Sequence, residues 1–279
     1  MSFEQFVADV EKATSERVKA EQGDYILDGL LHCGKCNTPK QCRVNILGEI
    51  RVPYCLCKCE TEKRDRAEAE FKQQQREHKI RELRKTGFPD SDMQNWTFAN
   101  DDMQNPRITQ AMQKYVESFP EMRKQGQGLL LYGKVGTGKT YEAAEVANAL
   151  IDRGYSVLVT NFARIANTVS GMYEGKQEYY DSLNRFSLLV LDDLGAERKT
   201  EYMSEIVYNI IDSRYRAGLP MIITTNLTAE ELKNPQDITN KRIYDRVIER
   251  CLPVEVEGKN RRHQKTTANY AELKQKFGL

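Results

Sequence analysis

The chain has 279 residues, of which 39% are hydrophobic and 30% charged, and its formal net charge is +1. This balance excludes a protein whose overall field draws it to nucleic acid or to a membrane surface, so any such contact must be local. No apolar run approaches the roughly 20 residues that cross a bilayer, and the charged N-terminus lacks a secretion signal. We expect a cytoplasmic protein with one α/β domain and a smaller module.

Apolar residues at helical spacing predict a short amphipathic helix over residues 3–22, which ends at Gly23. This helix either packs on its own module or docks on a partner.

Six of the seven cysteines lie between residues 33 and 59. In a reducing compartment they indicate thiols or a metal rather than disulfides. Two thiolate pairs separated by about twenty residues are typical of a structural zinc site, and a segment this small needs such a staple to fold. The favoured zinc ligands are Cys33, Cys36, Cys57 and Cys59. Cys55 is the first substitute and Cys42 lies outside the site; an iron–sulfur cluster or a small core of reduced thiols are the alternatives.

Residues 60–87 carry dense charge of mixed sign and contain no proline or glycine before Gly87. This pattern predicts an exposed helix that connects two domains. The predicted organisation is therefore a cysteine-rich module over residues 1–59, a helical linker over 60–87 and a larger domain over 88–279.

A glycine-rich loop follows the apolar segment 128–132 and ends in Gly138-Lys139-Thr140. Its spacing is that of a P-loop, in which glycines let several backbone N–H groups face one phosphate chain and the next helix adds its positive end. We expect Lys139 to contact the β- and γ-phosphates of ATP and the Thr140 hydroxyl to hold Mg²⁺. The candidate nucleotide-binding residues of the loop are Gly133, Lys134, Val135, Gly136, Thr137, Gly138, Lys139 and Thr140. Apolar residues before the loop, Trp96 among them, either line the adenine pocket or form ordinary core.

Strands and helices alternate from this point onward, which predicts βαβ units and a mostly parallel sheet with helices on both faces. The expected strands are 128–132, 155–160, 187–191, 219–225 and 252–256. The expected helices are 139–152, 162–183, 200–217 and 238–250.

Polar residues end two of these strands. Asp192 and Asp193 follow an apolar run, which is the Walker B arrangement, and Asn226 follows the strand 219–225. We expect Asp192 to hold Mg²⁺, Asp193 to orient the attacking water, and Asn226 to touch the γ-phosphate or that water. Asp193 is one methylene shorter than the more usual Glu, so activation of water is either slower or runs through a second water molecule.

Arginines recur late in the chain. Arg242, Arg246 and Arg250 are spaced four residues apart, on one face of a predicted helix, and Arg261 and Arg262 follow the last strand. The first set makes either surface salt bridges or contacts to a neighbouring subunit. The second set can reach a nucleotide in the same subunit.

These motifs, in this order, resemble those of the AAA+ ATPases. More narrowly, residues 191–198, 212–216 and 223–226 resemble the DnaC/DnaI-type replicative helicase loaders, and the cysteine-rich start resembles phage and mobile-element versions of them. The resemblance implies an AAA+ sheet of order 5-1-4-3-2, an N-terminal module that binds the hexameric DnaB-type helicase, binding of single-stranded DNA, and self-assembly. The helical lid of larger AAA+ proteins is absent or reduced to one helix over residues 270–277.

The resemblance also implies residue roles. Arg246 is the favoured arginine finger acting on a neighbouring subunit, with Arg242 next, and Arg261 or the adjacent Arg262 is sensor 2. Between strands two and three, Arg164 and Lys176 lie where related loaders contact single-stranded DNA, although a packing helix explains this segment equally well.

Three functions fit the motifs. The favoured one is an ATP-dependent loader of the replicative helicase onto single-stranded DNA, with ATP, Mg²⁺ and Zn²⁺ as cofactors and hydrolysis stimulated by assembly. The alternatives are an IstB-like transposition helper, which shares nearly all the ATPase motifs, and an ATP-gated adaptor with little hydrolysis.

Overall fold

The structure is a computed structural model that describes residues 20–46, 48–197, 200–235, 237–261, 270 and 273–278. Most of the helix expected over residues 3–22 therefore lies outside the described residues, whereas 270 and 273–277, within the helix expected over 270–277, are described and helical. Two compact units, Met1–Glu77 and His78–Leu279, divide the chain. The division falls inside the helix α2 (Lys58–Gly87), and each unit is described by itself.

The first unit contains two short antiparallel hairpins, which the sequence did not predict. Strand β1 (Tyr25–Leu27) pairs with β2 (Leu30–His32), and β3 (Val44–Ile46) pairs with β4 (Glu49–Arg51). Asp28 and Gly29 both have positive φ, 52° and 73°, which is the backbone of the tight turns that suit the twist of a hairpin.

Helix α2 begins at Lys58, two residues before the expected linker, and ends at Gly87 just before Phe88-Pro89. Proline cannot continue a helix and disfavours helical backbone at the preceding residue, so the stop follows from the sequence. Near its end, in the second unit, Arg84 donates a hydrogen bond of 2.8 Å to Asn148. Two 3₁₀ turns, η1 (Ser91–Asn95) and η2 (Phe98–Asn100), follow.

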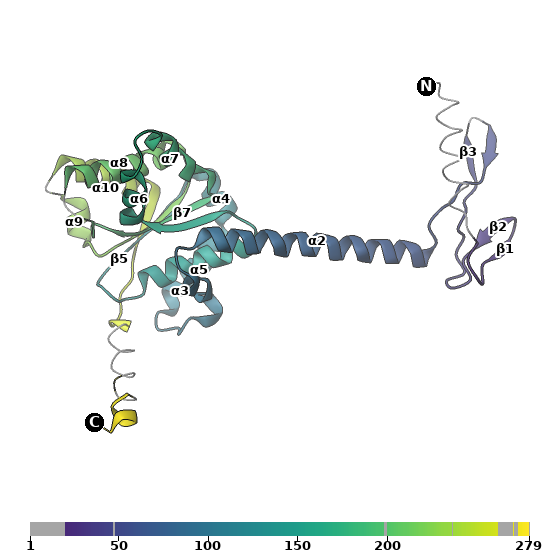
Figure 1. Ribbon diagram of the computed structural model, residues 1–279, viewed down its shortest axis with the longest axis horizontal. Coiled ribbons are helices and arrows are strands. Elements are labelled where there is room, and N and C mark those ends of the chain that lie inside the picture. The colour runs from purple at the N-terminus through teal and green to yellow at the C-terminus, as the bar shows by residue number, and fades with distance from the viewer. Residues whose placement is uncertain are drawn as a thin grey trace. The chain divides into compact units, whose positions relative to one another are not determined.

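A parallel five-stranded sheet forms the centre of the second unit (Figure 1). Its strands are β5 (Gly128–Tyr132), β6 (Val157–Asn161), β7 (Leu188–Leu194), β8 (Met221–Thr225) and β9 (Cys251–Glu255). From one edge the order is β9-β5-β8-β7-β6. Numbered along the chain this is 5-1-4-3-2, the order that the AAA+ resemblance implies.

Two helices of this unit, α3 (Pro106–Glu117) and α4 (Phe119–Gln125), precede the first strand of the sheet. Between its strands lie α5 (Lys139–Asp152), α6 (Phe162–Ser170), α7 (Lys176–Ser182), α8 (Glu201–Arg216), α9 (Ala229–Lys233) and α10 (Ile238–Arg250), with a 3₁₀ turn η3 (Leu183–Arg185). The expected helix over 162–183 is broken between α6 and α7, where Gly175 has a φ of 78°. Among the described helices, none combines the length and apolar character needed to cross a membrane.

Side chains of the strands pack alternately into two hydrophobic cores, one on each face of the sheet. Leu130, Leu189 and Ile223 pack with α6, α8 and α10 on one face of the sheet. Leu131 and Val190 lie in the other core, with residues of α3 and α5. Because side chains of a strand alternate between its two faces, a run such as 188–191 can be apolar throughout when helices cover both faces. The carboxyl ends of the strands, which this packing leaves at one edge, carry the polar residues of the site.

Candidate functional site: a phosphate loop and a four-cysteine cluster

The loop between β5 and α5 is rich in glycine, so a bound group can come close to its backbone. Gly133, Gly136 and Gly138 all have positive φ, of 143°, 83° and 108°, where a side chain is strained. Lys139 is 5% exposed, and its ammonium donates to the carbonyls of Gly133 at 2.9 Å and Lys134 at 2.8 Å. These two bonds turn the lysine back over its own loop, which places its charge beside the first turn of α5.

A third bond joins Lys139 to a different strand. Its Nζ donates at 2.8 Å to Oδ1 of Asn226, the residue directly after β8. The strand order makes this contact possible, because β8 is the direct neighbour of β5. The sequence thus placed Lys139 and Asn226 at one site, and the structure brings them together.

The Asp192 carboxylate accepts hydrogen bonds from two threonine hydroxyl groups. Its Oδ1 accepts hydrogen bonds from Thr140 Oγ1 at 2.9 Å and from Thr224 Oγ1 at 2.6 Å. Burial raises the pKa of the Asp192 carboxyl, and the two hydroxyl donors oppose that rise. A threonine hydroxyl and a carboxylate side by side are oxygen ligands of the kind that Mg²⁺ takes, so the donor set fits the ion. Thr224 also belongs to this group of oxygen atoms, a role that the sequence did not indicate.

Asp193 lies on an irregular part of β7. The pairing of β7 with β8 shifts between Leu191 and Leu194, and Asp193 has a φ of 59°, which is unusual for a residue other than glycine. Its backbone N–H donates to Thr224 Oγ1 at 2.9 Å, which fixes this bulge. Bulges re-aim side chains at functional sites. Here the bulge leaves Asp193 exposed at the pocket while its neighbour Asp192 is partly buried.

These groups surround a pocket of about 300 Å³. Its lining residues are Trp96, Asn100, Asp102, Val135, Gly136, Gly138, Lys139, Thr140, Tyr141, Asp193, Asn226 and Arg261. Trp96 stacks on Tyr141 with ring centroids 5.5 Å apart and planes inclined by 27°. The pocket therefore has a charged, glycine-rich part and an aromatic part, as a nucleotide requires. Of the aromatic pair, the sequence pointed to Trp96 but not to Tyr141.

Arg261 lies against the phosphate loop. Its backbone N–H donates to the Gly136 carbonyl at 2.9 Å, and a Cβ on Gly138 would lie 3.0 Å from its guanidinium carbon. The adjacent Arg262 is outside the described residues. Three acids that no sequence motif indicated lie near the Arg261 guanidinium: Asp102 at 3.2 Å, and Asp101 and Glu142 at 3.9 Å.

Neither Arg246 nor Arg242 is among the described residues that line this pocket. Arg246 forms an ion pair with Asp212 of α8 at 3.0 Å and donates to the Tyr208 hydroxyl at 3.1 Å, and its side chain is 26% exposed. Arg242, one turn earlier on α10, is exposed.

The cysteine-rich unit brings four sulfur atoms together. In the described part of the chain, one group of potential metal ligands is found, Cys33, Cys36, Cys57 and Cys59, whose sulfurs all lie within 4.8 Å of one another. These are the four cysteines favoured from the sequence. Cys33 and Cys57 are buried, and Cys42 and Cys55 are not part of the group. Four thiols in one cluster match the donor set of structural zinc.

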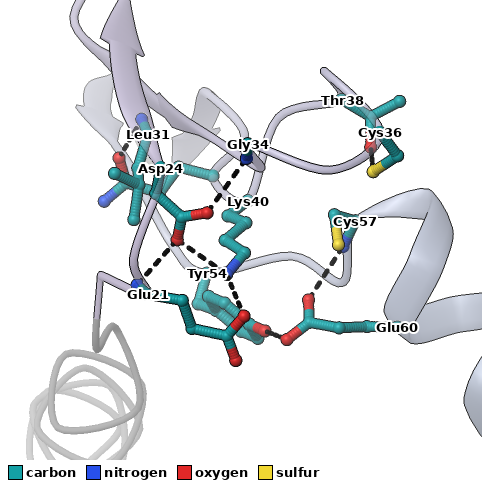
Figure 2. Close-up of polar contacts among 11 residues, drawn as sticks. Glu21, Asp24, Leu31, Gly34, Cys36, Thr38, Lys40, Tyr54, Cys57 and Glu60 are labelled. Atoms are coloured by element: carbon teal, nitrogen blue, oxygen red, sulfur yellow. Dashed lines mark hydrogen bonds and ion pairs between the residues drawn. The ribbon is translucent and has the colours of Figure 1, made fainter.

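Polar residues hold this cluster in place (Figure 2). Thr38 Oγ1 lies 3.1 Å from the Cys36 sulfur, and Glu60, in the first turn of α2, accepts a hydrogen bond from the Cys57 N–H at 3.1 Å. Behind them, Lys40 forms a buried ion pair with Asp24 at 2.8 Å. The side chain of Lys40 is 3% exposed and that of Asp24 2%, so the pair is shielded from water. Contacts of this kind orient metal ligands.

The DNA-contacting segment expected between β6 and β7 is helical and partly exposed. Arg164 on α6 and Lys176 on α7 are both exposed, and Tyr173 between the two helices is fully exposed. The Lys176 ammonium lies 5.8 Å from the centre of the Tyr202 ring. Cationic and aromatic side chains therefore share this surface.

A family model described as IstB-like ATP binding protein matches residues 57–269. The chain belongs to this IstB-like family. The match contains the whole phosphate loop, both Walker B acids and the arginines discussed above.

Curated relatives of this IstB-like chain include two proteins named as replicative helicase loaders. DnaI of Bacillus subtilis (strain 168) is 26% identical over 207 residues, which are 69% of this chain and 66% of DnaI. DnaC of Escherichia coli (strain K12) is 27% identical over 158 residues, which are 55% of this chain and 63% of DnaC. The matched part thus spans just under two thirds of the length of either relative.

Solved structures agree on the fold. A crystal structure of DnaI superposes with a TM-score of 0.53 and 26% identity, over 63% of this chain and 95% of that one. A crystal structure of the DnaC helicase loader gives a TM-score of 0.50 and 22% identity, over 60% of this chain and 100% of that one.

Proposed function

We propose that this chain is an ATPase that loads the replicative DNA helicase onto single-stranded DNA. The observation that carries the proposal is the convergence of Lys139, Asn226, Thr140 and Asp192 at the edge of one pocket, in a chain related to two proteins named as helicase loaders. Lys139 and Thr140 begin α5, Asp192 lies in β7 and Asn226 follows β8, so three separate elements of the fold bring these residues together.

Each residue of the pocket has a role in ATP hydrolysis. Lys139 contacts the β- and γ-phosphates, and the loop N–H groups hold the rest of the phosphate chain. Thr140 and Asp192 hold Mg²⁺, which when bound neutralises charge on the phosphates. Asp193 orients the attacking water and Asn226 senses the γ-phosphate. Arg261 contacts the nucleotide from the same chain, and the ring of Trp96 stacks on the base.

Hydrolysis depends on a second copy of the chain. Arg246, or the more exposed Arg242, completes the pocket of a neighbouring copy and stabilises the charge that develops during phosphoryl transfer. Support comes from their position on α10, away from the residues that line the pocket of their own chain. Self-assembly therefore controls turnover.

The N-terminal module, residues 1–59, holds the helicase. Zinc bound by Cys33, Cys36, Cys57 and Cys59 folds this module, which offers little apolar core: in the described part, Ile26 and Ile50 are 75% and 72% exposed. Single-stranded DNA contacts the other unit through Arg164, Lys176 and the nearby aromatic side chains.

The test is a loading assay on circular single-stranded DNA that carries an annealed oligonucleotide. A ring helicase enters a closed circle only when its ring is opened, so displacement of the oligonucleotide reports loading. We expect displacement by the cognate replicative helicase to require the chain and ATP, and to be lost with Lys139→Ala. Equal displacement without the chain would contradict the proposal. Stable, ATP-dependent coating of double-stranded DNA with no effect on the helicase would favour a transposition helper instead.

A further inference from the structure

Three acidic side chains lie at different distances from the Arg261 guanidinium. The shortest contact joins Arg261 Nη1 to Asp102 Oδ1 at 3.2 Å, whereas Asp101 and Glu142 each lie 3.9 Å away. The Arg261 side chain is 14% exposed. Its guanidinium is also close enough to the loop that a Cβ on Gly138 would lie 3.0 Å from Cζ. One cation is thus shared between the phosphate loop and an acidic group.

The two more distant acids are buried. The side chains of Asp101 and Glu142 are both 0% exposed, and Asp101 Oδ1 and both oxygens of Glu142 lack a hydrogen-bond donor. Burial, followed by the charge of Asp101, raises the pKa of the Glu142 carboxyl to about 7, and the nearby charge of Arg261 opposes that rise. Both acids lie within 3.9 Å of the guanidinium, and neither is among the described residues that line the pocket.

Asp102 differs from these two acids. Its side chain is 42% exposed and lines the same pocket as Lys139 and Thr140. Arg261 also lines this pocket, so a phosphate group bound there can reach the guanidinium with which Asp102 now pairs. Carboxylate and phosphate both bind a guanidinium through paired hydrogen bonds, so the two anions are alternatives.

We propose that Asp102 sets the nucleotide affinity of the pocket by competing with the phosphates for Arg261, while Asp101 and Glu142 keep the guanidinium at the loop. The inference rests on the proposed nucleotide binding and adds a residue that tunes it. Binding exchanges the Asp102–Arg261 ion pair for a phosphate–Arg261 pair, and the carboxylate turns to water. Nucleotide binding therefore has to break one half-exposed ion pair, and the affinity of the pocket for nucleotide is lower by that cost.

Asp102→Asn keeps the size of the side chain and removes its charge. Because exposed ion pairs are weak, we expect the variant to bind ATP about two- to fivefold more tightly than the native chain. Removing any acid near a polyphosphate also lowers general repulsion. Asp92→Asn is the matched control, since Asp92 is exposed in the 3₁₀ turn η1 and does not line the pocket. The ATP affinity of this variant is expected to equal that of the native chain.

A double-mutant cycle separates competition from repulsion. ATP affinity is measured by calorimetry, at fixed ionic strength, for the native chain, Asp102→Asn, Arg261→Lys, and the double variant. Lysine keeps the charge but cannot make the paired hydrogen bonds, and thermal melting shows whether each variant is folded. The inference predicts that the gain from Asp102→Asn is smaller in the Arg261→Lys background.

Equal gains in both backgrounds, or weaker binding by Asp102→Asn, would overturn the inference and leave nucleotide binding itself in place. A native chain that binds no ATP would overturn the proposed function as well.

Discussion

The hydroxyl of Thr140, in the first turn of α5, donates a hydrogen bond of 2.9 Å to the carboxylate of Asp192 at the end of β7. The two residues are separated by 52 positions in the sequence. They meet because the carboxyl ends of β5 and β7 lie at the same edge of the sheet, with β8 between them. Strand order therefore places side by side two oxygen atoms of the kind that Mg²⁺ binds.

Arg246 gives a prediction about assembly. We expect Arg246→Ala to bind ATP normally and to lose assembly-stimulated turnover by about a thousandfold, since an arginine finger acts only on the neighbouring pocket. The measurement is the rate of phosphate release as a function of protein concentration.

Asp212→Asn is the matched control for this variant, because it breaks the 3.0 Å ion pair of Arg246 and leaves the arginine in place. The control should keep most of the stimulated rate. Equal losses in the two variants would mean that Arg246 acts only by holding α10 to α8.

The cysteine cluster predicts the metal content. Purified chain should contain about one zinc ion, as structural sites of four thiolates do. Cys33→Ser and Cys57→Ser should lose it, while Cys42→Ser and Cys55→Ser should keep it, because the last two sulfurs lie outside the cluster. Metal analysis by mass spectrometry measures this. Loss of zinc from Cys55→Ser with retention in Cys57→Ser would reassign the ligands.

Glu145 predicts a pH dependence of stability. It is 0% exposed on α5, and burial, followed by the negative charge of nearby Glu142, raises the pKa of its carboxyl. The folded state therefore keeps a proton that the unfolded state releases. The free energy of unfolding should fall as pH rises above the ordinary carboxyl pKa of 4.5, by up to about 1.4 kcal/mol per pH unit for one proton.

Urea unfolding of native chain and Glu145→Gln at pH values from about 5 to 8 measures this slope. The glutamine variant should show a flatter dependence and greater stability at the upper end. Glu117→Gln, an exposed residue of α3, is the control and should behave like the native chain. Parallel slopes for native chain and Glu145→Gln would show that Glu145 is ionised in the folded state.

Arg164 and Lys176 give a prediction about DNA. Fluorescence anisotropy with a labelled single strand should show weaker binding by the double alanine variant, and a salt dependence reduced by about one to two released ions. A variant with alanine at Lys114 and Lys124, two exposed cations on α3 and α4, should bind as the native chain does. Unchanged binding by the first variant would remove this surface from the DNA site.

Much of the fold follows from local signals in the sequence. The bounds of β5, α5 and α10 agree with those expected, because a glycine-lysine-threonine turn fixes the start of α5 and Asp237 caps α10. The two hairpins of the cysteine-rich unit were missed, since strands of three residues are too short to show a period.

The finer parts of the site were beyond sequence reasoning. Asp193 owes its direction to a bulge that depends on pairing with β8, and the acids around Arg261 come from two separate segments, Asp101-Asp102 and the first turn of α5. Glu142 lies at a helix position that faces the interior, which the helical period does indicate. Its proximity to Arg261 is a tertiary contact that no local pattern encodes.

Nucleotide binding by the loop is tested most directly by the fluorescence of Trp96, the single tryptophan of the chain, which lines the pocket. We predict a saturable change in its emission when ATP and Mg²⁺ are added to the native chain. Inorganic tripolyphosphate, which has no base, should cause no such change. ATP should cause no change in the emission of Lys139→Ala. Lys114→Ala should respond as the native chain does. An identical ATP response from Lys139→Ala, or a native chain that shows no binding by either fluorescence or calorimetry, would contradict the account.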